Sequence, residues 1–439
     1  MMGQRQQANP KLFYVGVNIE ERIPPEHLYR KLARALNFDG VRPLVAHCYG
    51  DRGHESIDPV VLLKLYLITH LENVRSEREL VRHLAFRLDW LWFCGLDLDS
   101  PIPHHSVLSK ARARWGLKVF EQLFAQILGQ CQAAGLIEGK TVFADSTLLK
   151  AHADVRSRVA RELWNQLEAT QDPLPEDPAG AAVASATAAR PEAESSRPAP
   201  PLPAVSPTHT PAPPEDTQAH ELPRPPEGGF NAQWVSRTDP DAGTTLRRGR
   251  GVTLGYRDHT LTDNRCGVIL ATVATAAHYD DARLLPVLLD KAQAYVQVQP
   301  QEVVGDSQYG SQENRTRMRR RKIRPYLKRR TTRGENGSKS WLELLDPELD
   351  QGRAVRLMRR RQHVAEGRFA EAHARMGHRR CRQRRRWRVQ IQCYMVALTQ
   401  NALKLTRHPR SKPRHAATRA VYRCPTTLRH PPKHSTTLR

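Results

Sequence analysis

The sequence predicts an α/β protein, α+β overall, in which an all-α N-terminal part precedes a mixed-sheet domain. Two observations support this class. Apolar residues recur at helical spacing through most of residues 24 to 137, and short β-branched runs alternate with amphipathic segments beyond residue 139. With 439 residues and 39% hydrophobic content, the chain is long enough for more than one domain.

The N-terminal helices have recognisable start signals. Ser56 or Asp58 is an expected N-cap before Pro59, and a second helix is expected to begin near Ser76. Ser106 is expected to cap a basic helix, which carries Lys110, Arg112 and Arg114, and an amphipathic helix follows as far as Gly135. This block either serves only for packing or also grips DNA through the basic helix, and the sequence leaves both open.

A strand, TVFADSTLL, comes next, and the composition then changes. Residues 171–229 are rich in Pro, Ala, Ser, Glu and Thr. Such a segment cannot bury enough apolar area to offset the entropy of ordering, so we expect a disordered insertion.

The remaining elements follow in a regular order. Val252–His259 and Gly267–Thr275 are expected to form a hairpin around the turn Thr262-Asp263-Asn264. Helix 280–295, strand EVVGD, a basic helix after Ser311, strand IRPYL and a long helix from Ala354 to Ala374 come next, before a final helix. With TVFADSTLL first, this is the element order of a ribonuclease-H-like domain interrupted by the insertion.

Charge narrows the class of partner. Sixty-nine Lys and Arg against 45 Asp and Glu give a net charge of +24, which favours binding to a polyanion such as a nucleic acid backbone. No apolar stretch approaches the roughly 18 residues of a spanning helix, and the start lacks a signal-peptide pattern, so we expect a cytoplasmic protein without a membrane partner. The seven scattered cysteines include no C-x-x-C pair and are expected to be reduced.

The basic residues cluster in two runs. Eleven Lys and Arg lie between Arg315 and Arg333, and eight Arg lie between Arg375 and Arg388, with no acidic residue in either run. A solvated helix face normally mixes both signs, so these runs indicate phosphate contacts or disorder.

Three acidic residues occupy suitable places for a metal site. Asp145 lies within the first strand, Asp306 at the end of a later strand, and Glu366 in the long helix. Carboxylate oxygens suit Mg²⁺, and two such ions can activate a hydroxyl and stabilise a leaving oxygen at phosphorus. Taken singly, Asp306 could instead cap a helix and Glu366 could instead form a surface ion pair.

The surrounding sequence resembles a known family. VFADSTLLKAHAD, VVGDSQYGSQEN and VAEGRFAEAHARMGHRR resemble the three catalytic blocks of bacterial insertion-sequence DDE transposases, and residues 56 to 112 resemble their helical N-terminal domain. The resemblance implies that Asp145, Asp306 and Glu366 are the catalytic, metal-binding triad, with Mg²⁺ as cofactor and Mn²⁺ as a substitute. It further implies double-stranded DNA as partner, both the terminal inverted repeats and the target, with a homodimer on DNA in the bacterial nucleoid.

The resemblance also divides the chain into parts. The expected parts are a helical domain for DNA-end binding (1–138), the first catalytic strand with its helix (139–170), the disordered insertion (171–229), the rest of the catalytic domain (230–406) and a basic flexible tail (407–439). The GYkDH-like strand of the family falls on Gly255 to His259.

Individual DNA contacts are expected in the same regions. Tyr309 and Arg361 match family positions near the second and third acids, and His373 stands where relatives carry a lysine. The full set of expected DNA-binding residues is Tyr309, Arg319, Arg320, Arg361, His373, Arg379, Arg380, Lys110 and Arg112. Because neutral histidine is not a permanent cation, the sequence leaves open a decayed transposase that only binds DNA, and also a nuclease without strand transfer.

Overall fold

The computed structural model describes residues 18–50, 56–170, 229–247, 251–329 and 344–408. The predicted disordered insertion, apart from Gly229, and almost all of the predicted tail lie outside these residues. Among the residues described, no helix is both long and apolar enough to cross a membrane.

The N-terminal part is helical, as predicted, and two of its predicted caps form. Its helices are α1 (Ile19–Arg22), α2 (Leu28–Ala35), α3 (Val41–Val45), η1 (Ala46–Cys48), α4 (Pro59–Leu71), α5 (Glu77–Leu84), α6 (Leu88–Cys94) and α7 (Ser106–Ala133). The Asp58 carboxylate accepts a hydrogen bond from Val60 N at 2.9 Å, with Pro59 in the first turn, and Ser76 Oγ accepts from Glu79 N at 3.1 Å. Asp58, and not Ser56, is therefore the cap of α4.

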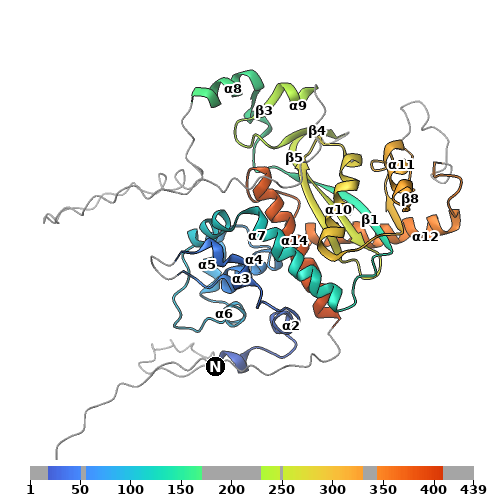
Figure 1. The fold of residues 1–439 in the computed structure, drawn as a ribbon. Coiled ribbons are helices and arrows are strands. Elements are labelled where there is room, and N and C mark those ends of the chain that lie inside the picture. Colours follow the sequence, from blue (N-terminus) through green and yellow to red (C-terminus); the bar gives the residue numbers. More distant parts are fainter. Residues whose placement is uncertain (1–17, 51–55, 171–228, 248–250, 330–343, 409–439) are drawn as a thin grey trace, which may run out of the picture.

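Helix α7 differs from the prediction at both ends. His105 precedes the first helical residue, so Ser106 begins the helix and does not cap it. The two predicted helices join across a kink at Gly116, whose φ of 63° only glycine adopts readily. The second half of α7 packs against the last helix, α14 (Arg386–Arg407), and the two run side by side between the N-terminal helices and the sheet (Figure 1).

The sheet is mixed and follows the ribonuclease-H-like order. Its central strands run β6-β5-β1-β7-β8, and β4 pairs with the first residues of β5. Strand β1 is antiparallel to β5 and parallel to β7, which is parallel to β8. The strands are β1 (Thr141–Lys150), β4 (Gly243–Arg247), β5 (Gly251–Asp263), β6 (Ile269–Ala276), β7 (Glu302–Gly305) and β8 (Arg324–Leu327).

The hairpin turn lies later than predicted. Thr262 pairs with Ile269, and Asp263 N donates to Val268 O at 2.8 Å, so β5 continues through both residues. The predicted turn at Thr262-Asp263-Asn264 is therefore wrong. The chain reverses between Asn264 and Gly267, and Gly267 has a φ of 67°.

A small module not predicted from the sequence flanks residues 171–228. It consists of η2 (Val155–Ser157), β2 (Arg158–Ala160), α8 (Arg161–Thr170), α9 (Phe230–Gln233) and β3 (Trp234–Ser236). Strand β2 pairs antiparallel with β3, which brings the two sides of the interruption together at the top of Figure 1. Only α8 falls where a helix was expected.

Helices cover both faces of the sheet. Alternate residues of a strand point to opposite faces. Val142 and Ala144 pack in one core with residues of α7, α10 (Leu284–Val296) and α14, whereas Phe143 packs with residues of α12 (Gln351–Arg361). The first core continues into the N-terminal helices, so it crosses the predicted boundary at residue 138. The remaining elements are η4 (Asp281–Arg283), α11 (Gln312–Arg320), a π-helical turn η5 (Gln362–Glu366) and α13 (Gly367–Arg375).

Candidate active site

Strand pairing brings Asp145 and Asp306 together. Along the parallel pair β1 and β7, Phe143 is opposite Val304. Extending this register by two residues places Asp145 beside Asp306, which directly follows the last residue of β7, and the charge of Asp306 acts on Asp145. Because neighbouring strands are about 4.8 Å apart, the two carboxylates lie at the same edge of the sheet.

Glu366 approaches the same place from the helix side. Asp145 lies on the face of β1 that Phe143 shares, and this face packs against Ala354, Leu357 and Ala365. Glu366 is the last residue of the π-helical turn that separates α12 from α13. Such turns interrupt a helix at the cost of regular hydrogen bonding and are frequent at functional sites.

The guanidinium of Arg361 joins two of the three acids. Its Nη1 lies 3.1 Å from Asp145 Oδ2, and its Nη2 lies 3.1 Å from Glu366 Oε1. The Arg361 side chain is 9% exposed, whereas the Glu366 side chain is 53% exposed. Asp145, Asp306 and Glu366 therefore gather around one partly open site, and Arg361 contacts carboxylates in it.

Burial raises the pKa values of Asp145 and Asp306. It raises the pKa of Asp145 to about 6, and the nearby charge of Asp306 adds to the rise, while Arg361 and the backbone N–H of Ser146 oppose it. Burial also raises the pKa of Asp306, against the hydrogen bond that its Oδ1 accepts from Gln308 N at 2.9 Å. Two neighbouring carboxylates with raised pKa values are a local concentration of negative charge that attracts a cation.

Tyr309 has a different place from the expected one. Its side chain is fully buried beneath the Asp306 loop, and its hydroxyl is 3.4 Å from His259 Nδ1. A buried ring has no surface to offer to DNA, so the expected DNA contact of Tyr309 is not supported in this conformation. Gly310 explains why the loop can pack so closely here, because a Cβ on it would lie 1.7 Å from Lys328 O.

A buried carboxylate outside the triad, Asp281, contacts the segments that carry Asp145 and Asp306. Its Oδ2 accepts from Ser146 Oγ at 2.8 Å and from Arg257 Nη1 at 2.9 Å. Arg257 Nη1 also donates to Gln308 Oε1 at 3.1 Å, which links the chain next to Asp145 with the chain after Asp306. The sequence analysis missed Asp281. Arg257 and His259 alternate along the GYRDH strand and therefore point to the same face, where both lie near Asp281. Two basic side chains on one buried face could have indicated an acidic partner.

His373 lies near the acids but as a neutral side chain. Its Nε2 is 3.2 Å from Thr147 Oγ1, which shares a face of β1 with Asp145. Burial lowers the pKa of His373 to about 4, and the positive charges of His378, Arg379 and Arg368 contribute. The position that carries a lysine in the resembled family is therefore uncharged near neutral pH.

Family models match the chain on both sides of Asp145. Residues 17–114 match the model of a transposase domain (DUF772), and residues 223–402 match that of a transposase DDE domain. The second match includes Asp306 and Glu366, and the fold places Asp145 beside them. The chain belongs to the insertion-sequence DDE transposases. No curated protein and no solved structure matches it.

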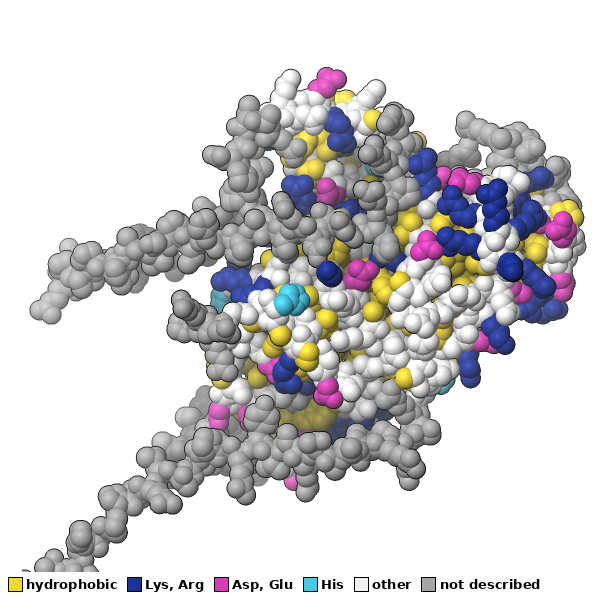
Figure 2. Space-filling view, in the orientation of Figure 1, with side chains coloured by type: hydrophobic (Ala, Val, Ile, Leu, Met, Phe, Trp, Pro, Cys, Tyr) yellow, Lys and Arg dark blue, Asp and Glu magenta, His cyan; other side chains and the backbone are white. Residues whose placement is uncertain are grey.

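Part of the first basic run of the transposase forms ion pairs with acids of the same chain. Figure 2 shows Lys and Arg side chains gathered over α11, β8 and α12, with acidic side chains among them. Arg319 pairs with Asp346 at 2.7 Å, and Arg321 pairs with Asp290 at 2.7 Å. These acids come from other parts of the chain, which is why the run alone suggested an unmatched positive charge. Arg320 is exposed.

The second basic run also serves two purposes. Arg382 is largely buried and its guanidinium donates to Val74 O and, at 3.2 Å, to Asn73 Oδ1, so it ties the N-terminal helices to the catalytic sheet. Arg379 and Arg380 are exposed beside the end of β1, where Lys150 N donates to Arg379 O at 2.9 Å. Because β1 and β7 are parallel, this end of β1 lies in the same direction as Asp306, five residues beyond Asp145 along the strand.

The basic helix of the N-terminal part also has one exposed basic residue and one that forms contacts within the chain. Lys110 is exposed on α7. Arg112 instead forms an ion pair with Glu77 and lies over the ring of Tyr66, with 5.6 Å between guanidinium carbon and ring centroid. Its role in this conformation is to pack α7 against α4 and α5.

A second group of metal-ligand residue types lies deep in the core. Ligand atoms of Asp258, His378 and Cys393 lie within 4.8 Å of one another. Asp258 already accepts from His378 Nε2 at 2.9 Å and Thr272 Oγ1 at 2.5 Å, and burial raises the pKa of the Cys393 thiol. A neutral thiol is a poor ligand, so this group fits a hydrogen-bonded core cluster better than the metal centre.

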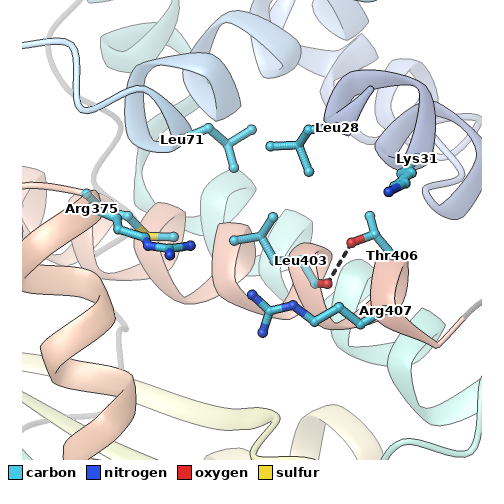
Figure 3. Close-up of a pocket in the computed structure, with 8 residues that line it drawn as sticks. Leu28, Lys31, Leu71, Arg375, Leu403, Thr406 and Arg407 are labelled. Atoms are coloured by element: carbon cyan, nitrogen blue, oxygen red, sulfur yellow. Dashed lines mark hydrogen bonds between the residues drawn. The ribbon is translucent and has the colours of Figure 1, made fainter. Parts of the chain in front are cut away.

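A pocket lies at the junction of the two parts of the chain (Figure 3). It has apolar and basic lining residues from α2, α4, α13, α14 and the residue after α13, namely Leu28, Lys31, Leu71, Arg375, Met376, Leu403, Thr406 and Arg407. None of the three clustered acids lines it.

Proposed function

We propose that this transposase cuts DNA at the ends of its mobile element and joins the freed 3′-hydroxyl to target DNA, with divalent metal ions held by Asp145, Asp306 and Glu366. The observation that carries this proposal is the meeting of three acids from a strand, a strand end and a helix at one sheet edge.

The donor set suits the proposed metal. All three side chains offer hard oxygen ligands, which Mg²⁺ prefers and for which Mn²⁺ can substitute. Arg361 shows that a positive group is accommodated between Asp145 and Glu366. Asp145, Asp306 and Glu366 would together hold the ions.

The reaction then divides between the metal and the chain. Bound divalent ions would supply activation of the attacking oxygen and stabilisation of the leaving oxygen. The chain fixes the positions of the acids. Strand register holds Asp145 beside Asp306, Asp281 contacts β1 at Ser146, and Arg257 contacts the loop after Asp306 at Gln308. Arg379 and Arg380 would hold DNA phosphates at the same edge. Water is the nucleophile for cleavage and the DNA 3′-hydroxyl for transfer, both in line at phosphorus.

Two assays test this function. In the first, duplexes that carry candidate element ends are incubated with the protein and Mg²⁺. We expect cleavage by the wild type and none by Asp145→Ala, with DNA binding retained by both. Wild-type binding without metal-dependent cleavage would contradict the proposal and favour a transposase that only binds DNA.

The second assay separates joining from cutting. A pre-cleaved end with a free 3′-hydroxyl is supplied together with target DNA, so that cleavage is no longer needed. We expect joined products that depend on Mg²⁺ and on two ends held by a dimer. Cleavage in the first assay without joining in the second would identify a nuclease without strand transfer.

A further inference from the structure

The guanidinium of Arg361 forms ion pairs with two different carboxylates. Arg361 is the last residue of α12 and is buried. Its two terminal nitrogens contact Asp145 and Glu366. Its third nitrogen, Nε, is buried and has no hydrogen-bond partner among the residues that the structure describes. An unsatisfied buried donor is costly, so the guanidinium is only partly satisfied where it lies.

A second arginine of the same helix shows what a fully satisfied pair looks like. Arg353 donates from Nε to Glu302 Oε1 at 2.6 Å and from Nη2 to Glu302 Oε2 at 2.7 Å. That bidentate geometry is the strong form of an arginine–carboxylate pair. Arg361 instead contacts two different acids, and both are metal ligands in the proposed function.

We propose that Arg361 is an internal counter-cation that competes with divalent metal for Asp145 and Glu366, so that metal loading is coupled to capture of its guanidinium by a DNA phosphate. This inference rests on the proposed function, since it takes these acids as metal ligands. In this proposal the Arg361 guanidinium moves between the two acids and a DNA phosphate, and is not a permanent DNA contact.

Charge explains why a resident cation is needed. Asp145 is largely buried beside Asp306, and an uncompensated buried charge is strongly destabilising. The guanidinium offsets that cost in the metal-free protein. Because its nitrogens contact Asp145 Oδ2 and Glu366 Oε1, ligation through these oxygens requires that it move away.

The guanidinium has a natural destination. Its planar fork binds phosphate as well as carboxylate, and the unused Nε adds a donor for a phosphate oxygen. A phosphate at the partly exposed Glu366 would therefore release Asp145 while metal enters. Such coupling is reciprocal: DNA tightens metal binding, and metal tightens DNA binding by the same factor.

The test measures Mn²⁺ affinity of the full-length protein without DNA, by electron paramagnetic resonance of free Mn²⁺. We expect Arg361→Gln to bind Mn²⁺ about tenfold more tightly than the wild type, within the usual range of such couplings. Arg359→Gln removes the same charge from an exposed position of α12 and should leave the affinity within about twofold. Equal or weaker binding by folded Arg361→Gln overturns the inference.

Two further measurements secure the result. In the metal-free state, Arg361→Gln should melt at a lower temperature than Arg359→Gln and recover more on addition of Mn²⁺. If Arg361→Gln is unfolded by circular dichroism, Arg361→Lys replaces it, because a lysine lacks the fork that holds both acids. It should then bind Mn²⁺ more tightly than the wild type, and unchanged affinity overturns the inference.

Asp145→Asn separates this inference from the proposed function. Undiminished Mn²⁺ binding by Asp145→Asn would show that the metal lies elsewhere, and both ideas would fail. Binding lost in Asp145→Asn but not tightened in Arg361→Gln would keep the metal site and reject only the competition.

Discussion

Asp145 lies beside Asp306, which directly follows the neighbouring parallel strand β7, although residues 171–228 and a hairpin separate the two acids in the sequence. Their proximity depends on the register of β1 and β7. A shift of β7 by one residue would turn Asp306 toward the other face of the sheet. The site is therefore a property of the sheet, and neither local motif is sufficient for it.

Replacing Asp306 by Asn should remove cleavage while sparing DNA affinity. An amide is a weaker metal ligand than a carboxylate, so we expect excision to fall on the order of a thousandfold or more. Mobility shifts with the element ends should be unchanged, since the basic residues remain. Excision that persists in this variant would show that Asp306 is not part of the triad.

Replacing Asp281 by Asn should weaken the site indirectly. The change leaves Arg257 without its main carboxylate partner and should lower the free energy of unfolding by about 2 kcal/mol. Mn²⁺ affinity should also fall, because Ser146 and Gln308 lose their common support. Asp290→Asn breaks the exposed pair with Arg321 and is the matched control; equal destabilisation by both changes would remove the positioning role of Asp281.

His373 should make stability depend on pH between about 6.5 and 4. Burial lowers its pKa to about 4 in the folded protein, so the unfolded chain binds more protons in this window. The stability contributed by the neutral ring is present above pH 6.5 and is lost as the pH falls, by about 1–3 kcal/mol.

Chemical denaturation at several pH values checks this. His373→Gln should lose less stability than the wild type between pH 7 and 4, whereas His363→Gln, at an exposed position of the π-helical turn, should follow the wild type. Parallel curves for wild type and His373→Gln would show that His373 titrates normally.

Arg379 and Arg380 should each contribute one phosphate contact. The double variant Arg379→Gln, Arg380→Gln should bind DNA more weakly at low salt, and the slope of log affinity against log salt should decrease by about two. Arg321→Gln, which loses a guanidinium paired with Asp290, should change the slope less. An unaltered slope in the double variant would place the DNA elsewhere.

Local sequence patterns were enough to predict the strands and the helix that carry the three acids. Apolar β-branched runs before Asp145 and Asp306 predicted their strands, and the helical spacing around Glu366 predicted its helix, although not the π-helical turn. Asp58 and Ser76 could be predicted as caps because a cap bonds within its own first turn.

Long-range partners could not be predicted in this way. Arg361 and Arg382 resemble their exposed neighbours in sequence, yet one contacts Asp145 and the other Val74. Tyr309 was expected to contact DNA because it matches a family position near Asp306, and the fold buries its ring. Strands β2 and β3 have three residues each, too few for a periodic pattern, and they pair with each other across residues 171–228.

The most direct test of the central claim is anomalous diffraction from crystals soaked in Mn²⁺. The account predicts the strongest peak between Asp145 and Asp306, with Glu366 at its side and the Arg361 guanidinium moved away. A strongest peak at Asp258, His378 and Cys393, with none beside Asp145, would contradict it.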